Sequence, residues 1–243
     1  MRHLTLAAIL LGQMAVPVAV GVYSPVSAHG DVKPQAVDTA GLPDLGEEWL
    51  EENPFRDPDG EHWARAIEVG SSGYNSNCAR CHGLEVVSGG LAPDLRYLEA
   101  NFDGDEWYLE RYQNGYTQNG ITKMPAFGEL LGQEAAWAIR TYIETRPDDG
   151  ALEEYGDELA TIRDDLIAKA DMVASGDKTV ADFTAETNAL RTTMAEIADA
   201  LETGSGAPKA ESPASRAVAY LDGSPNSLKN AAEALTVGLS AAQ

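Results

Sequence analysis

The stretch Asn77-Cys78-Ala79-Arg80-Cys81-His82 holds both cysteines of the 243-residue chain. Two residues separate the cysteines, and a histidine follows the second one directly. This C-x-x-C-H spacing is typical of covalent c-type haem attachment. The two thiols add to the vinyl groups of the haem, and the adjacent histidine becomes the proximal ligand of its iron. The motif therefore predicts one covalent haem c, attached through Cys78 and Cys81, with His82 as an axial ligand.

Three other uses of these residues are weaker. A thioredoxin-like redox pair would need a βαβ context, which the surrounding pattern lacks. A structural zinc ion needs four ligands, and this neighbourhood offers three. A simple disulfide-closed loop between Cys78 and Cys81 remains the plain structural alternative.

The flanks of the motif predict two helices that pack together. Apolar residues recur at offsets of three and four over residues 61–77. This spacing predicts a helix with one apolar face, directly before the motif. A second helix is predicted over residues 133–145, with Trp137 and Ile139 on its apolar face. Gly70 is small enough for the two helices to cross closely.

The second axial ligand is predicted to be Met124, in the loop before the last of these helices. No histidine follows His82, so a second histidine ligand would have to be His29 or His62, from upstream. Met124 lies 42 residues after His82 and precedes a proline. A thioether is a soft ligand, and the His/Met pair raises the reduction potential of haem iron.

The N-terminus has the pattern of an export signal. Arg2 and His3 precede an apolar run over residues 4–23, and the small-residue sequence Val26-Ser27-Ala28 follows. We expect residues 1–28 to be a signal peptide that is cleaved after Ala28. A retained membrane anchor is the alternative, because the run approaches the ~20 residues that span a bilayer.

The charge of the chain is strongly acidic. It has 39 acidic and 17 basic residues, a net charge of −22. This argues against nucleic acid or an anionic membrane surface as a partner. Residues 29–146 carry 21 acidic and 9 basic residues, and residues 147–243 carry 18 and 7. Docking to a basic partner and solubility or salt adaptation both remain open as explanations.

A family resemblance joins these features. Residues 61–146 resemble a small class I cytochrome c, through the C-x-x-C-H motif, Ala92-Pro93-Asp94-Leu95 and Met124-Pro125. Residues 29–146 resemble more narrowly the c-550-type cytochromes of quinoprotein alcohol dehydrogenase systems. The motifs that carry this resemblance include His29-Gly30-Asp31-Val32, Gly41-Leu42-Pro43, Trp49-Leu50, Asn53-Pro54, Ser88-Gly89-Gly90 and Ala135-x-Trp137-Ala138-Ile139.

The resemblance implies a function and further site residues. Members of that family accept electrons from periplasmic alcohol dehydrogenases that carry pyrroloquinoline quinone (PQQ), and pass them toward a terminal oxidase. It also implies that the Pro93 carbonyl accepts a hydrogen bond from the second ring nitrogen of His82. Arg96, Trp107 and Tyr112 are candidates for the haem edge or the propionates, and are equally consistent with packing or a solvated charge.

Residues 147–243 have no counterpart in that family, and their pattern is helical. Apolar stripes predict an antiparallel hairpin of two helices that turns at Ser175-Gly176-Asp177, a linker over residues 203–213 and weaker helices beyond it. Met172 and Met194 fall on the stripes and are expected to fill the core. A solubilising bundle, a docking module and an oligomerisation module are the open interpretations.

Together these features predict an all-α protein with a signal peptide (1–28), an N-terminal arm (29–60), a haem domain (61–146) and an acidic helical extension (147–243). The predicted function is a periplasmic single-electron carrier and not an enzyme. Its donor would be a quinoprotein dehydrogenase, and its acceptor a cytochrome oxidase or another cytochrome. A fixed relay subunit of a dehydrogenase complex is one alternative. A haem-based sensor or peroxidase-like protein is another, but it needs an open sixth position, against which Met124 argues.

Overall fold

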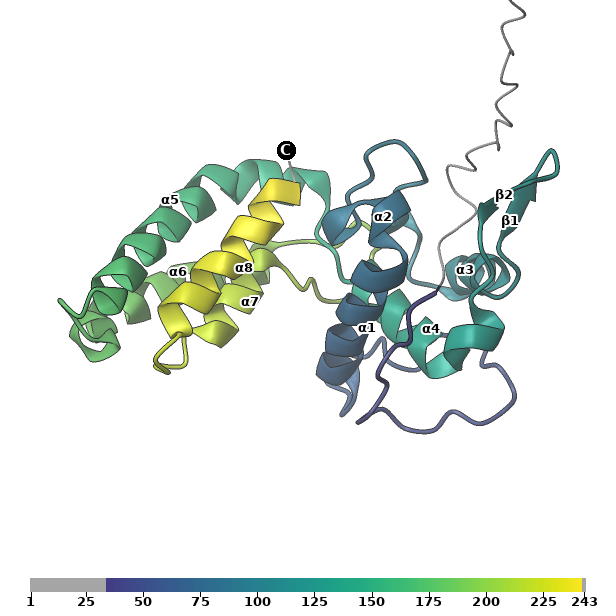
Figure 1. The fold of residues 1–243 in the computed structure, drawn as a ribbon, viewed down its shortest axis with the longest axis horizontal. Helices are drawn as coiled ribbons and strands as arrows, with labels where there is room; N and C mark the ends of the chain where they lie inside the picture. The colour runs from purple at the N-terminus through teal and green to yellow at the C-terminus, as the bar shows by residue number, and fades with distance from the viewer. Residues whose placement is uncertain (1–33, 242–243) are drawn as a thin grey trace, which may run out of the picture.

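A computed structural model describes residues 34–241, and it is all-α apart from one small hairpin (Figure 1). The signal peptide predicted over residues 1–28 lies outside this range. None of the helices within the described range combines the length and apolarity that crossing a bilayer demands. The elements are α1 (Trp63–Asn77), α2 (Ala79–His82), η1 (Leu84–Val86), η2 (Leu95–Tyr97), α3 (Phe102–Asn114), β1 (Tyr116–Gln118), β2 (Ile121–Met124), α4 (Gly128–Glu144), α5 (Asp149–Ala174), η3 (Val180–Phe183), α6 (Thr184–Ala200), α7 (Pro213–Tyr220) and α8 (Ser227–Ala241).

The crossing of α1 and α4 is the main packing contact of the first half of the chain. Both helices lie where the sequence predicts them, although α4 begins earlier, at Gly128, and bends at Gly132. A Cβ atom on Gly70 would overlap the carbonyl oxygen of Ala138, so only glycine allows this approach. The side chains of Ala66, Trp137 and Ala138 are fully buried around the crossing.

Helix α3 and the β1–β2 hairpin fill the interval between the two crossing helices. The side chain of Asn101 caps α3 by accepting a hydrogen bond from the Gly104 amide at 2.9 Å. The helix ends at Gly115, whose positive φ of 68° turns the chain into β1. The antiparallel hairpin that follows pairs Tyr116 with Met124. The sequence predicts a loop here. The two strands have only three and four residues and are exposed, so they show little of the alternation between apolar and polar residues that identifies a strand.

The N-terminal arm is held to α3 and α4 by a buried ionic network. Arg56 donates to Asp105 at 2.7 Å and to Glu144 at 3.0 Å, and Arg140 donates to Asp105 at 2.9 Å. Asn53 adds a hydrogen bond from its side chain to Glu144 at 3.0 Å. Residues 34–60 form no helix or strand, and these polar contacts attach the arm to the helices.

The extension consists of α5 to α8, which lie to one side of α1 and α4 in Figure 1. As predicted, α5 and α6 are long helices whose apolar stripes face inward, and Gly176 turns the chain between them with φ 81°. Helix α5 packs mainly on α8, and α7 packs on both α6 and α8. Met194 is fully buried, as expected. The expectation for Met172 is wrong: it lies at the solvent edge of its stripe, and is 44% exposed.

The predicted linker over residues 203–213 is a packed segment and not a free connection. Thr203 forms an antiparallel bridge with Pro147, and the Ser205 carbonyl accepts a hydrogen bond from the Ala100 amide at 3.0 Å. The Glu211 amide donates to the Thr145 carbonyl at 2.8 Å. Small residues, which suggest a linker in a sequence, here permit close backbone approach.

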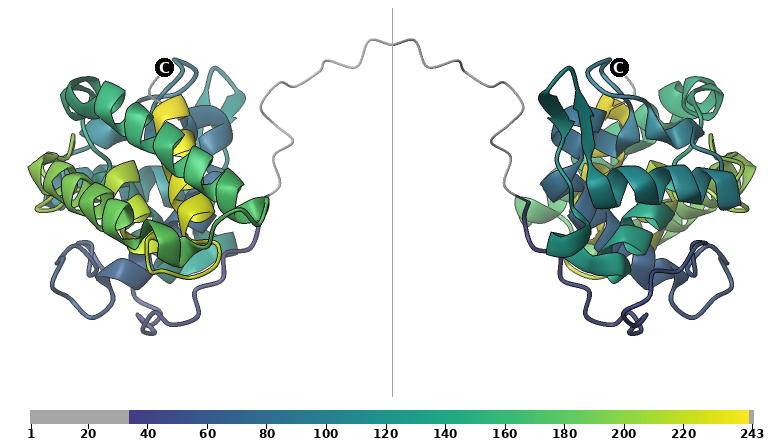
Figure 2. Two further views of the ribbon diagram at one scale, coloured as in Figure 1. Left: turned by 90° about the vertical axis from the view of Figure 1, so that its left-hand side faces the viewer. Right: turned by 90° about the vertical axis from the view of Figure 1, so that its right-hand side faces the viewer.

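The apolar cores of the two halves are separate. The buried apolar residues between Leu159 and Leu239 form one cluster, and those before residue 147 form two others around α1 and α4. The two end-on views in Figure 2 show the extension helices from one side and the α3, α4 and hairpin face from the other. The halves therefore meet through main-chain hydrogen bonds and ion pairs more than through a shared core.

The helix crossing gives a stability prediction. Gly70→Ala should lower the free energy of unfolding of the protein by about 3 kcal/mol, because the added methyl group forces α1 and α4 apart. Gly156→Ala in α5 is the matched control, since a Cβ there meets nothing within 4 Å and alanine favours helix by about 1 kcal/mol. Urea unfolding followed by circular dichroism measures both. Equal stability of the two variants would contradict the close crossing.

Candidate functional site

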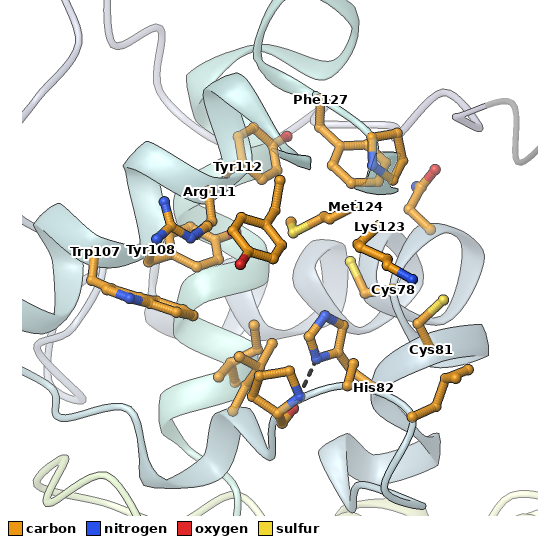
Figure 3. Close-up of a pocket in the computed structure, with 18 of the residues that line it drawn as sticks. Cys78, Cys81, His82, Trp107, Tyr108, Arg111, Tyr112, Lys123, Met124 and Phe127 are labelled. Carbon is orange, nitrogen blue, oxygen red and sulfur yellow. Dashed lines mark hydrogen bonds between the residues drawn. The ribbon is translucent and has the colours of Figure 1, made fainter. Parts of the chain in front are cut away.

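A cavity of about 630 Å³ lies between α2, the segment 91–95, α3 and the β1–β2 hairpin. Its volume falls in the range of sites for cofactors and other small molecules, and its walls are mainly apolar and aromatic. Cys78, Cys81, His82 and Met124 all reach it, as Figure 3 shows. The apolar and aromatic side chains that line it include Leu91, Leu95, Trp107, Tyr108, Tyr112, Tyr116, Phe127 and Ile143.

The C-x-x-C-H motif forms the junction of α1 and α2. Cys78 ends α1, with its amide donating to the Tyr74 carbonyl at 2.7 Å, and it is also the residue that precedes α2. The His82 amide donates to the Cys78 carbonyl at 3.0 Å, which closes one helical turn. One turn therefore places both thiols and the histidine ring on the side of the helix that faces the cavity (Figure 3).

Both cysteines are free thiols in the structure, so they do not form the disulfide-closed loop considered above. Burial raises the pKa of the Cys78 thiol to about 12, and the neighbouring Cys81 adds to this shift. Within residues 34–241, no group of three or more histidine, cysteine, aspartate or glutamate side chains is arranged to hold a metal ion. Neither a zinc cluster nor a βαβ unit surrounds the motif in the described part of the chain.

The ring of His82 is oriented by a hydrogen bond. Its Nδ1 atom lies 2.9 Å from the Pro93 carbonyl oxygen. A carbonyl can only accept, so Nδ1 carries the proton and Nε2 keeps its lone pair free for a metal. Burial lowers the pKa of His82, against the raising effects of the Pro93 hydrogen bond and of Asp94. The ring is therefore neutral at pH 7, which is the form that binds iron.

Met124 approaches the cavity from the opposite side to His82 (Figure 3). It is the last residue of β2, and its position depends on Gly115, because a Cβ there would overlap the Met124 carbonyl oxygen. After Pro125, the Phe127 amide donates to the Tyr112 carbonyl at 2.8 Å and fixes the start of α4. Of the other histidines, His62 contacts Phe55 and is not part of the cavity wall, and His29 lies outside the described residues.

The three candidates for the haem edge or the propionates do not all lie at the cavity. Trp107 and Tyr112 line the cavity, and Arg96 does not. The buried Arg96 side chain instead pairs with Asp94 and Asp149, each at 2.7 Å.

Sequence analysis missed Arg111 and Lys123, the basic side chains of the cavity wall. The Arg111 guanidinium lies over the rings of Trp107 and Tyr116, at 5.4 and 5.3 Å from their centroids. On α3, Arg111 follows Tyr108 by three residues and Trp107 by four, and this spacing from two aromatic residues is the signal that could have identified the arginine.

The donor set suits one covalently attached haem. Two thiols stand one helical turn apart, a neutral imidazole faces the cavity from one side, and a thioether faces it from the other. The aromatic wall suits the flat macrocycle, and Arg111 and Lys123 suit its anionic propionates.

Comparisons with known proteins agree with this chemistry. Residues 65–143 match the family model described as cytochrome C oxidase, cbb3-type, subunit III. Cytochrome c550 of Pseudomonas aeruginosa is 56% identical over 118 residues, which cover 49% of this chain and 81% of that protein. No solved structure gives a significant match.

Two enzymes of Pseudomonas putida also match in part. Quinohemoprotein alcohol dehydrogenase ADH-IIG is 34% identical over 92 residues, and ADH IIB is 30% identical over 96 residues. The matching stretches cover 38% and 39% of this chain, but only 12% of either enzyme. The similarity therefore concerns a small part of each dehydrogenase.

The paired thiols give a direct prediction. A Cys78→Ala, Cys81→Ala double variant, expressed with a cytochrome c maturation system, should lose all haem that resists acid-acetone extraction. Arg80→Ala is the matched control, because this exposed side chain lies between the cysteines and should leave attachment intact. The measurement is the haem absorbance of the extracted protein. Non-extractable haem in the double variant would contradict the assignment.

Proposed function

The chain belongs to the c-type cytochromes, in the family of cytochrome c550, and from this premise we propose that it carries single electrons in a bacterial periplasm from a PQQ-dependent alcohol dehydrogenase toward a terminal oxidase. As a c-type cytochrome it is an electron-transfer protein with covalently bound haem c, and not an enzyme. The observation that carries the proposal is the convergence of His82 and Met124 on one aromatic cavity beside two free thiols.

We assign the residues as follows. Cys78 and Cys81 would attach the haem covalently, and His82, through Nε2, and Met124, through Sδ, would bind its iron. Bound there, haem c supplies an iron that changes between the ferric and ferrous states. Pro93 holds the His82 ring and increases its basicity through the hydrogen bond at Nδ1.

The walls of the cavity give the conditions for fast transfer. Aromatic and apolar side chains form most of its wall, so a haem bound there would be largely surrounded by groups that do not reorient as water does. Arg111 and Lys123 would offer positive charge to the propionates of a bound haem, which would favour their ionised form in a mainly apolar site. Leu91 and Tyr116 are 60% and 41% exposed where they line the cavity, so its edge is accessible to a partner.

The donor is proposed from the comparisons and the charge together. The partial matches to two quinohemoprotein alcohol dehydrogenases support alcohol oxidation as the source of electrons. The net charge of −22 suits a donor whose docking surface is basic. Export through residues 1–28 would place the carrier in the same compartment as such a donor.

A fixed relay subunit is the second candidate, favoured by one observation. In the two dehydrogenases, the stretch that resembles this chain is 12% of a longer polypeptide, so a related unit exists inside an enzyme. Stable co-purification of this chain with a dehydrogenase at high salt would favour the relay, whereas loss of the partner in high salt supports a diffusible carrier.

The axial assignment predicts the effect of one substitution. Met124→Ala should remove the weak charge-transfer band at the red end of the ferric spectrum and lower the reduction potential, because the thioether no longer favours the ferrous state. It should also let exogenous imidazole bind the iron. Met172→Ala is the control, since this methionine is exposed on α5 and should change neither property. An unchanged band in Met124→Ala would reject the assignment.

The donor assignment is tested by stopped-flow reduction with a purified quinoprotein dehydrogenase and its alcohol. We expect bimolecular reduction whose rate falls steeply with salt, as the Debye length shortens from ~30 Å at 0.01 M to ~8 Å at 0.15 M. A nearly flat rate would assign the acidity to solubility. Absence of reduction by any such dehydrogenase, with chemical reduction intact, would reject the donor class and keep the electron carrier.

A further inference from the structure

The turn directly after His82 has a strained backbone. Gly83 has φ 86°, and a Cβ there would overlap the Val87 carbonyl oxygen. Two non-glycine residues follow with left-handed φ angles, Glu85 at 53° and Val86 at 67°. Side chains rarely adopt this conformation, and a β-branched residue is among the least suited to it. Such a turn persists only where its surroundings hold it, and the Glu85 side chain is one of the groups through which distant parts of the chain contact it.

The extension supplies one of the contacts that hold this turn. The Glu85 carboxylate accepts from Arg216 of α7 at 2.9 Å and from Arg146 at 3.0 Å. Glu211 completes the group by pairing with both arginines, at 3.0 Å from Arg216. Two carboxylates and two guanidinium groups thus balance in a mostly buried cluster. Burial raises the pKa of Glu85, but Arg216 and Arg146 more than offset this and bring the pKa below its usual value.

The extension also reaches the other end of the same loop. Pro93, whose carbonyl orients His82, is followed by Asp94, which accepts from the buried Arg96 at 2.7 Å. Arg96 in turn pairs with Asp149, the first residue of α5, at 2.7 Å. The Tyr97 hydroxyl donates to the same Asp149 at 2.8 Å. Asp149 is exposed, so this contact is weaker than the one at Arg216.

We infer that the extension is a positioning element for the iron ligand: Arg216, through Glu85, and Asp149, through Arg96, hold both ends of the 83–94 loop and thereby the Pro93 carbonyl against His82. The inference rests on the proposed role of His82 as an axial ligand. On this inference, residues 147–243 affect the geometry of the redox site. Neither a solubilising role nor a docking role would require that.

The test uses the full-length, haem-loaded protein in its ferrous state. Proton NMR measures the exchange of the His82 Nδ1 proton with solvent, and a redox titration measures the reduction potential. The variants are Glu85→Gln, Arg216→Gln and the double variant. Lys229→Gln is the matched control, because it removes one positive charge from an exposed i,i+4 pair elsewhere in the extension.

Both single variants should exchange the Nδ1 proton roughly tenfold faster, because the loop opens more often. Both should also raise the potential, since a weaker bond to Pro93 makes His82 a less basic ligand. Lys229→Gln should leave the exchange rate unchanged, and Arg216→Lys should restore it in part.

A purely electrostatic effect gives a different pattern. Removing the negative charge of Glu85 would raise the potential, removing the positive charge of Arg216 would lower it, and the double variant would return to the wild-type value. That pattern, with unchanged proton exchange, overturns the inference. If Arg216→Gln fails to fold, Asp149→Asn carries the same test from the exposed end of the loop: faster exchange supports the inference, and wild-type exchange overturns it.

The two proposals fail in different ways. A wild-type protein without a haem-shifted His82 signal would overturn the proposed axial role, and the inference with it. A normal wild-type signal that no variant changes would overturn the inference alone.

Discussion

The close approach of α1 and α4 at Gly70 is the constraint on which the site depends. Helix α1 ends at Cys78, so the crossing fixes the position of the two thiols and of His82. Helix α4 begins four residues after Met124, so the same crossing fixes the chain that brings the thioether to the other side of the cavity. The proposed axial ligands are 42 residues apart in sequence and line the same cavity. Gly70 itself is not part of the cavity wall, so it acts on the site through the ends of the two helices that it lets approach.

A second constraint is electrostatic. Arg56, Arg140, Asp105 and Glu144 form a network with two charges of each sign, in which Arg56 is partly exposed and the other three side chains are buried. Taking such groups out of water is costly, and the cost is offset only while each charge keeps its partners. Burial raises the pKa of Glu144, although Arg140 and Arg56 act to lower it. Because Arg56 comes from the arm, this network connects the arm to α3 and α4.

Local spacing in the sequence was informative where the chemistry itself is local. The C-x-x-C-H motif, the helices on either side of it, the role of Gly70 in the crossing and the long helices of the extension all follow from offsets of one to four residues. The pairing of Glu85 with Arg216 joins positions 131 apart, and no periodicity signals it. The β1–β2 hairpin, the packed segment 203–213 and the exposure of Met172 likewise depend on which distant surfaces meet. Small residues in a sequence are compatible with both a loose linker and a tight contact, and only the fold distinguishes them.

The separate apolar cores on either side of residue 147 have an evolutionary consequence. A helical unit that shares no core with its neighbour can be gained, lost or exchanged without repacking that neighbour. At the junction, only a small set of polar contacts must be matched. These are a few main-chain hydrogen bonds and the partners of Glu85, Arg146 and Arg96. A small electron carrier could thus acquire a helical domain by gene fusion. A few substitutions at these polar contacts would then be enough to connect the added helices to its redox centre.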